Sequence, residues 1–147
     1  MDQPLIKVTM AILHRDGCFL MQLRDDLPYI RYPGIWGFFG GHIEADETPA
    51  NGVKRELGEE IGYVPAQVDL FCERVGAGYE RYYYYAELAL PLSELDLNEG
   101  QDMALCSVAE VRLGRKYSEK LGEVRSLGGP HRQVLLDFME SGLVSFG

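Results

Sequence analysis

The sequence predicts a mixed α/β (α+β) protein in which helices pack against a mixed β-sheet. Short apolar runs of strand length recur along the chain, beginning with 8–13. Residues 48–62 and 130–142 carry the start and stop signals of two helices. No internal repeat, low-complexity tract or composition shift divides the 147 residues, so we expect a single domain over 1–147.

The composition is that of a soluble globular protein with an acidic balance. Hydrophobic residues make up 46%, charged residues 25%, and the formal net charge is −9. Because nucleic-acid binders need a basic face to neutralise phosphates, we expect no nucleic acid as partner. A small phosphorylated substrate needs a cation or an arginine cluster to offset the acidic field. Three widely spaced cysteines, no signal-peptide pattern and only short apolar runs predict a cytoplasmic protein without zinc, disulfides or membrane spans.

The N-terminal part is expected to begin with a β-hairpin. After the strand over 8–13, Asp16-Gly17 favours a tight turn because glycine accepts a positive φ. Segment 18–24 alternates apolar and polar side chains, as a returning strand does, and a proline-containing loop over 25–33 follows. Segment 34–44 then mixes aromatic residues with four glycines. So much glycine predicts that this backbone bends or lies close to another part of the molecule.

Three helices and three further strands are predicted in the rest of the chain. Thr48 can cap a helix with Pro49 in its first turn, and Gly62 ends that helix. Ser107 opens a capping box for a short helix, and a last amphipathic helix is expected over 130–140. Strands are expected over 68–74, 79–90 and 103–106.

The first predicted helix carries three carboxylates on one face. Glu56 and Glu59 are three residues apart, and Glu56 and Glu60 are four apart, spacings that bring helical side chains together. Two like charges at about 4 Å repel by roughly 4 kcal/mol at an effective dielectric near 20. With only Arg55 nearby in sequence, this face is expected to bind a cation, and oxygen ligands favour Mg²⁺ or Mn²⁺ over zinc. The alternative is a solvated acidic face, but Gly58 in mid-helix indicates close packing.

Segment 41–63 resembles the Nudix box. The matching residues are Gly41, Glu47 and the run Arg55-Glu56-Leu57-Gly58-Glu59-Glu60-Ile61-Gly62-Tyr63. Tyr63 stands where an aliphatic residue is usual, and Phe39 where a proline is common. The resemblance extends over 8–138 and implies the Nudix fold, an α/β/α sandwich around a mixed sheet. It also implies Mg²⁺-dependent (or Mn²⁺-dependent) hydrolysis of a phosphoanhydride bond in a nucleoside diphosphate linked to another moiety. Homodimers are common in this family.

The same resemblance assigns roles to single residues. Glu56, Glu59 and Glu60 resemble the family's metal ligands, which the carbonyl of Gly40 often joins. Glu47 and Arg55 resemble the structural pair that orients the loop and the helix, and Arg55, also a catalytic candidate, partly neutralises the acidic cluster.

The general base is open between two glutamates. Segment 97–101, Leu-Asn-Glu-Gly-Gln, resembles the loop that supplies a glutamate base in many family members, which makes Glu99 the first candidate. Its alternatives are a further metal ligand or an ordinary loop residue. Glu59 is the competing base because it lies on the metal-binding face.

Four residues are candidates for substrate binding. Arg24 is a candidate phosphate contact, against the alternative of a surface arginine. Trp36 and Phe38 are candidates for stacking on a base or sugar, against the alternative of core packing. Tyr79 begins a tyrosine-rich strand whose side chains should alternate between the core and a cleft or partner.

Two functions remain after these observations. The first is a hydrolase acting on nucleotide sugars, nucleoside triphosphates or dinucleoside polyphosphates. The alternative is a catalytically inactive Nudix domain that senses a nucleotide. Such domains usually lose box glutamates, and all of them are present here, which favours the enzyme. The sequence leaves the substrate, the number of metal ions and the attacked phosphorus open.

Overall fold

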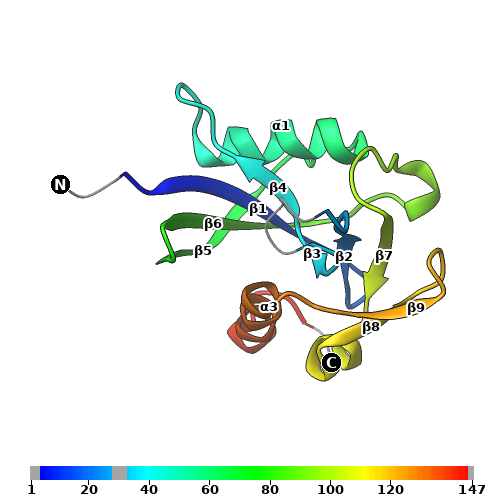
Figure 1. Ribbon diagram of the computed structural model, residues 1–147. Coiled ribbons are helices and arrows are strands. Elements are labelled where there is room, and N and C mark those ends of the chain that lie inside the picture. The colour runs from blue at the N-terminus through cyan, green and yellow to red at the C-terminus, as the bar shows by residue number, and fades with distance from the viewer. Residues whose placement is uncertain (1–3, 28–32, 146–147) are drawn as a thin grey trace.

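In the computed structural model, which describes residues 4–27 and 33–145, a seven-stranded mixed sheet lies between helices (Figure 1). Its main path runs in the order β3-β2-β1-β6-β5, with β4 paired to β1 and β7 paired to β2. The strands of this sheet are β1 Ile6–Arg15, β2 Cys18–Leu23, β3 Trp36–Gly37, β4 Phe39–His42, β5 Asp69–Gly76, β6 Tyr79–Glu87 and β7 Asp102–Cys106. Part of the predicted loop, 28–32, lies outside the described residues.

The remaining elements are a small hairpin and the helices. The helices are α1 Pro49–Ile61, α2 Val108–Leu113 and α3 Gly129–Ser141, with a 3₁₀ turn η1 at Leu92–Glu94; the hairpin is β8 Arg115–Ser118 and β9 Glu123–Ser126. None of the helices in the described residues is long and apolar enough to cross a membrane.

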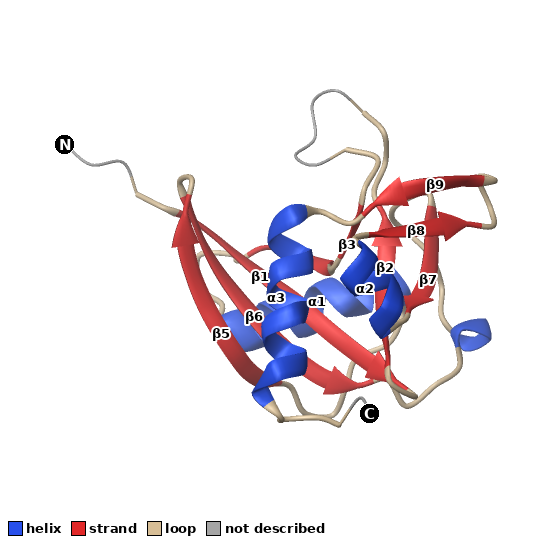
Figure 2. Ribbon diagram, turned by 90° about the horizontal axis from the view of Figure 1, so that it is seen from below, coloured by secondary structure: helices blue, strands red, loops and turns tan. Residues whose placement is uncertain are grey.

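The sheet separates two apolar cores, and β6 contributes to both. Tyr84 packs in the core beneath α1, and its neighbour Tyr83 packs in the core beneath α3. Leu57 of α1 and Phe138 of α3 are fully buried against these opposite faces. Figures 1 and 2 show α1 and α3 on the two sides of the sheet. The predicted α/β/α sandwich and the alternation of the tyrosines are therefore confirmed.

The predicted helix signals also appear in the structure. The Thr48 side chain accepts a hydrogen bond from the Asn51 amide at 3.2 Å, and Gly62 ends α1 with a φ of 67°. Ser107 forms the predicted capping box at the start of α2. A Cβ at Gly58 would lie 3.3 Å from Val64, so the predicted close packing of mid-helix α1 is present.

Two predictions need correction. The strand expected over 79–90 ends earlier, at Glu87, because β6 follows β1 only as far as the pair His14 and Glu87. The β8–β9 hairpin was not predicted, because its residues are mostly polar and alternate too briefly to give a strand signal.

Candidate active site

The glycine-rich segment brings backbone against the carboxylates of α1. Gly40 lies in β4 with a φ of 148°, and a Cβ there would stand 2.1 Å from the Thr9 carbonyl oxygen of β1. A Cβ at Gly41 would stand 2.6 Å from a Glu56 oxygen. The Gly40 amide donates a hydrogen bond to Glu60 at 3.1 Å. The expectation that this backbone lies close to another part of the molecule is confirmed.

Arg55 lies at the centre of the acidic cluster. It donates two hydrogen bonds to the Glu47 carboxylate, at 3.0 and 2.7 Å, and one to Glu56 at 3.0 Å. It also lies within 3.4 Å of Glu59 and 3.7 Å of Glu44. The hydrogen bonds from Arg55 lower the pKa of Glu47 to about 2. One guanidinium therefore orders four carboxylates but cannot neutralise them.

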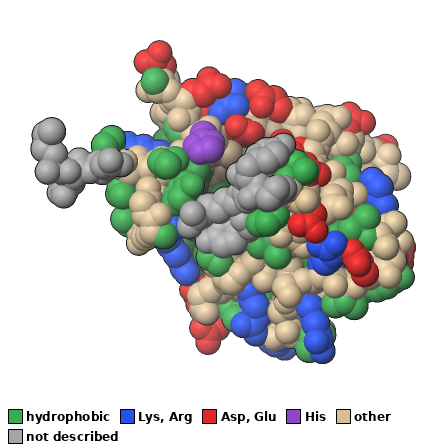
Figure 3. All heavy atoms as spheres, viewed as in Figure 1, with side chains coloured by type: hydrophobic (Ala, Val, Ile, Leu, Met, Phe, Trp, Pro, Cys, Tyr) green, Lys and Arg blue, Asp and Glu red, His purple; other side chains and the backbone are tan. Residues whose placement is uncertain are grey.

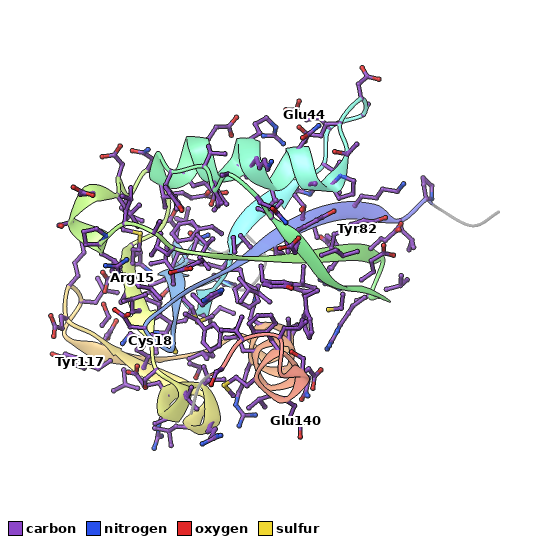
Figure 4. All side chains as sticks on the ribbon, turned by 180° about the vertical axis from the view of Figure 1, so that it is seen from behind. Arg15, Cys18, Glu44, Tyr82, Tyr117 and Glu140 are labelled. Atoms are coloured by element: carbon purple, nitrogen blue, oxygen red, sulfur yellow. The ribbon has the colours of Figure 1, made fainter. Side chains whose placement is uncertain are left out.

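The acidic side chains lie together on the surface at one edge of the molecule. In Figure 3 they gather over α1 and the loop before it. Figure 4 shows Glu44 at this edge, on the α1 side of the sheet. An electronegative surface of this kind repels a phosphorylated substrate unless a cation is bound there.

The three box glutamates differ in exposure. The Glu59 side chain is 61% exposed and contacts Arg55 on the outer side of the cluster, whereas Glu56 is 15% exposed. Glu60 is buried, at 3%, and its Oε2 atom has no hydrogen-bond partner within the described part of the chain. Burial raises the pKa of Glu60 well above its usual range, and the neighbouring carboxyls of Glu99 and Glu56 raise it further.

These observations fit a hard divalent cation. A buried carboxylate oxygen without a partner, next to two further carboxyls, is costly unless it is protonated or bound to a cation. The candidate ligands are all oxygens, which suits Mg²⁺ or Mn²⁺. Among residues 4–27 and 33–145, no three acidic, His or Cys side chains already converge in a metal-binding arrangement. Arg55 holds two of the three box glutamates, Glu56 and Glu59.

A pinned loop brings Glu99 to this cluster. Asn98 binds the end of α1 twice, through its amide to the Glu60 carbonyl at 2.9 Å and through its side chain to the Glu59 carbonyl at 3.1 Å. These bonds use carbonyls that a helix end otherwise leaves unpaired. On the other side, Gln101 donates from its amide to the Leu23 carbonyl and from its side chain to the Arg24 carbonyl. Glu99 is therefore fixed between the end of α1 and the end of β2. These two elements are far from Glu99 in the sequence, so the contact could not be predicted from local patterns.

A pocket of about 220 Å³ opens beside Gly40, Gly41 and Glu99. Arg24 and Tyr79, both predicted as substrate contacts, line it. It is formed on the α3 side of the sheet by β1, β4, β6 and the first turn of α3.

Two further lining residues of this pocket, Arg81 and His131, were not predicted as site residues. Arg81 lies within the tyrosine-rich strand, and His131 lies at the start of the last predicted helix. His131 is buried, and burial followed by the charges of Arg24 and Arg81 lowers its pKa to about 3. At neutral pH this imidazole is therefore uncharged.

The stacking role predicted for Trp36 and Phe38 is wrong. Trp36 is 0% exposed, and its indole nitrogen donates to the Lys116 carbonyl at 3.1 Å. Phe38 is 1% exposed and packs edge-on against Tyr83 and His131. Neither ring offers a face to a ligand, because both complete the core beneath α3, which was the alternative interpretation.

Comparison with known proteins gives a family match for most of the chain and relatives for less than half of it. A family model described as "NUDIX domain" matches residues 4–125. Over 58 residues the chain is 40% identical to the CTP pyrophosphohydrolase of Escherichia coli (strain K12), covering 40% of this chain and 42% of that protein. Over 56 residues it is 43% identical to the RNA pyrophosphohydrolase of Marinomonas sp. (strain MWYL1), covering 37% of this chain and 35% of that protein. The matched segments thus span less than half the length of either relative.

The fold matches solved structures over nearly the whole chain. The MutT protein from Methanosarcina mazei Go1 superposes with a TM-score of 0.69 and 20% identity, covering 98% of this chain and 99% of that chain. At this identity the match establishes the fold alone.

Proposed function

Because the chain belongs to the NUDIX family, we propose that it hydrolyses a phosphoanhydride bond in a nucleoside diphosphate linked to another moiety. The observation that carries this proposal is the buried, unpartnered oxygen of Glu60 beside Glu99, at the pocket that holds Arg24. Burying several carboxyl groups together costs folding free energy, and a protein that only binds an anionic ligand does not need such a group in its site.

The proposed cofactor is Mg²⁺ or Mn²⁺, held by Glu56 and Glu60 with Glu59 and the Gly40 carbonyl. Bound there, the ion supplies charge neutralisation of the phosphates and a lowered pKa for a nearby water. Arg55 keeps Glu56 and Glu59 in position through its contacts at 3.0 and 3.4 Å.

Glu99 is the proposed general base. Its carboxylate accepts the proton of the attacking water, and the pinned loop holds it at the pocket for this purpose. Arg24, which lines the pocket together with Glu99, is the proposed contact for the phosphate oxygens. Glu59 is the less favoured base, because its exposed side chain is held by Arg55 on the outer side of the cluster.

The two relatives are named for CTP and for RNA, so candidate substrates extend from free nucleotides to the 5′ end of an RNA. The net charge of −9 favours the free nucleotides. A screen with Mg²⁺ and with Mn²⁺ should therefore include nucleoside triphosphates, nucleotide sugars, dinucleoside polyphosphates and a triphosphorylated RNA oligonucleotide, with both products identified by chromatography.

The decisive variants in that screen are Glu60→Gln and Glu99→Gln. Glu60→Gln should lower turnover by about 100-fold or more through weaker cation binding. Glu99→Gln should lower kcat by about 100-fold while Mn²⁺ binding persists. Full activity in Glu60→Gln would refute the assigned ligand. Nucleotide binding by the wild-type protein without turnover of any compound would instead support the inactive sensing domain.

A further inference from the structure

Arg81 is held in the pocket by uncharged groups. Its guanidinium lies 4.8 Å from the centre of the Tyr79 ring, and its Nη1 donates to the Gly76 carbonyl at 3.3 Å. Tyr79 and Arg81 are two residues apart on β6 and so project from the same face of the sheet. The stacked ring and the carbonyl restrain the guanidinium without cancelling its charge.

Three other arginines near the sheet form ion pairs. Arg55 pairs with Glu47, Arg74 with Asp137 and Arg125 with Glu123. Arg81 makes no ion pair with any residue in the described ranges. A restrained cation that faces a pocket and lacks a carboxylate partner there points to an anionic ligand.

The position of Arg81 separates it from the acidic cluster. In the sheet, Arg81 of β6 is level with Val8 of β1, which is level with His42 of β4. Two strand spacings put the Arg81 backbone about 10 Å from that of His42, the residue after Gly41. The pocket therefore has an acidic end at Glu99 and the glycines, and a cationic end at Arg81.

His131 adds no charge between these ends. It is buried against Phe38 in the wall of the pocket, 5.0 Å between ring centres. Because burial keeps it neutral, the positive charge of the pocket comes from the two arginines that line it, Arg24 and Arg81.

We propose that Arg81, braced by Tyr79, is a specificity-determining residue that binds the phosphate furthest from the acidic end. The substrate class is then nucleoside triphosphates, in preference to nucleoside diphosphates that carry a neutral sugar. This inference rests on the proposed function. In the reaction, the water oxygen bonds to one phosphorus and the bridging P–O bond breaks. The displaced phosphate oxygen keeps the electron pair, and one water proton passes to Glu99.

The same stacking changes the expected role of Tyr79. The ring face that meets the Arg81 guanidinium is covered, so that face does not stack on a nucleobase. Tyr79 acts as a positioning residue through Arg81.

The test compares substrates that differ only beyond the diphosphate: UTP with UDP-glucose, GTP with GDP-mannose and ATP with ADP-ribose. With Mg²⁺, the wild-type protein should have a higher kcat/KM for the triphosphate of at least one pair. Arg81→Gln should lower kcat/KM for that triphosphate by about 10- to 100-fold and leave the sugar partner within about twofold. Tyr79→Leu should give a smaller loss with the same selectivity, and Tyr79→Phe should retain the wild-type preference.

Arg115→Gln is the matched control. It removes the same positive charge from an exposed residue of β8 that does not line the pocket. Its kinetics should be those of the wild type. Three results would overturn the inference while the proposed function stands. Arg81→Gln could lower kcat/KM equally for both members of a pair, or it could leave kcat/KM unchanged. The wild-type protein could also prefer the sugar nucleotides.

Calorimetry with the α,β-methylene analogue of ATP and with ADP-ribose separates the two claims. If the wild-type protein hydrolyses none of the triphosphates and sugar nucleotides of the kinetic test, the proposed function fails. In that case the role of Arg81 would still be supported if the wild-type protein bound the analogue more tightly than ADP-ribose and Arg81→Gln abolished this difference. If the wild-type protein showed no such difference, the role of Arg81 would be overturned as well.

Discussion

The two ends of the pocket obtain their charge in different ways. At the acidic end, Glu56 and Glu60 come from one turn of α1, and Arg55 beside them orders the cluster. At the cationic end, Arg81 lies within β6, and no motif marks it; Arg24, which follows β2, lines the pocket beside Glu99. The acidic end is crowded with like charges that need a cation, whereas Arg81 is held by an aromatic ring and a carbonyl.

This difference separates reaction chemistry from substrate choice. A cluster built on consecutive helical turns is rigid, since each residue depends on its helical neighbours. A wall assembled from separate strands can change one residue at a time without disturbing the glutamates. We therefore expect substitutions at the acidic end to remove turnover and substitutions at the cationic end to change substrate selectivity.

The largest effect should come from removing the metal ion. Chelation should reduce turnover to background and lower the thermal stability, because a ligand at about 100 times its Kd stabilises the folded state by roughly 2.7 kcal/mol. In Glu60→Gln the stabilisation by Mg²⁺ should shrink, and the metal-free variant should be more stable than the metal-free wild type because a buried carboxyl among carboxyls is removed. Thermal unfolding with Mg²⁺ and with chelator measures both. Identical wild-type curves in the two conditions would contradict the metal site.

A second large effect is expected from Arg55→Lys. The lysine keeps the charge but cannot make the paired hydrogen bonds to Glu47, so the carboxylates shift and kcat should fall by about 100-fold. Arg132→Lys is the control: it also breaks two guanidinium contacts, but these are to the carbonyls of Val111 and Arg112 in α2 and not to the acidic cluster. That variant should lose stability and keep its kcat. An unchanged kcat in Arg55→Lys would show that charge alone suffices.

The cationic end predicts a pH dependence of stability through His131. Its pKa is about 3 in the folded protein and about 6.5 when unfolded, so the unfolded state binds the extra proton between these values. The stability that the neutral His131 side chain contributes to the folded state is fully present above pH 6.5 and is lost as the pH falls toward 3. Over that range, the unfolding free energy of the wild type relative to His131→Gln should fall by about 1.4 kcal/mol per pH unit. Denaturant titrations at several pH values measure this, and a flat difference would mean that His131 titrates normally.

The smallest effect is expected from Asn98→Ala. The loss of one side-chain hydrogen bond to the Glu59 carbonyl should cost about 1 kcal/mol of stability. Because Glu99 becomes less well positioned, kcat should fall by about fivefold with little change in KM. Steady-state kinetics would show a structural effect alone if kcat stayed constant while stability fell.

The acidic end was largely predictable from sequence because its signals are local. Helical spacing aligns Glu56 and Glu60, and the caps at Thr48 and Gly62 set the helix bounds. Packing across the sheet was not predictable in this way. Whether Trp36 faces a cleft or the core depends on Lys116, far away in the chain. The role of Arg81 was hidden for the same reason, since its pocket forms only when β1, β4 and β6 come together.

The central claim is that the α1 carboxylates bind the divalent cation that the reaction needs. Calorimetric titration with Mn²⁺ tests it directly, using wild-type protein, Glu60→Gln and the exposed control Glu119→Gln. The wild type and Glu119→Gln should bind Mn²⁺ with equal affinity, and Glu60→Gln should bind at least about tenfold more weakly. Equal affinity in all three proteins, or no binding by the wild type, would contradict the claim.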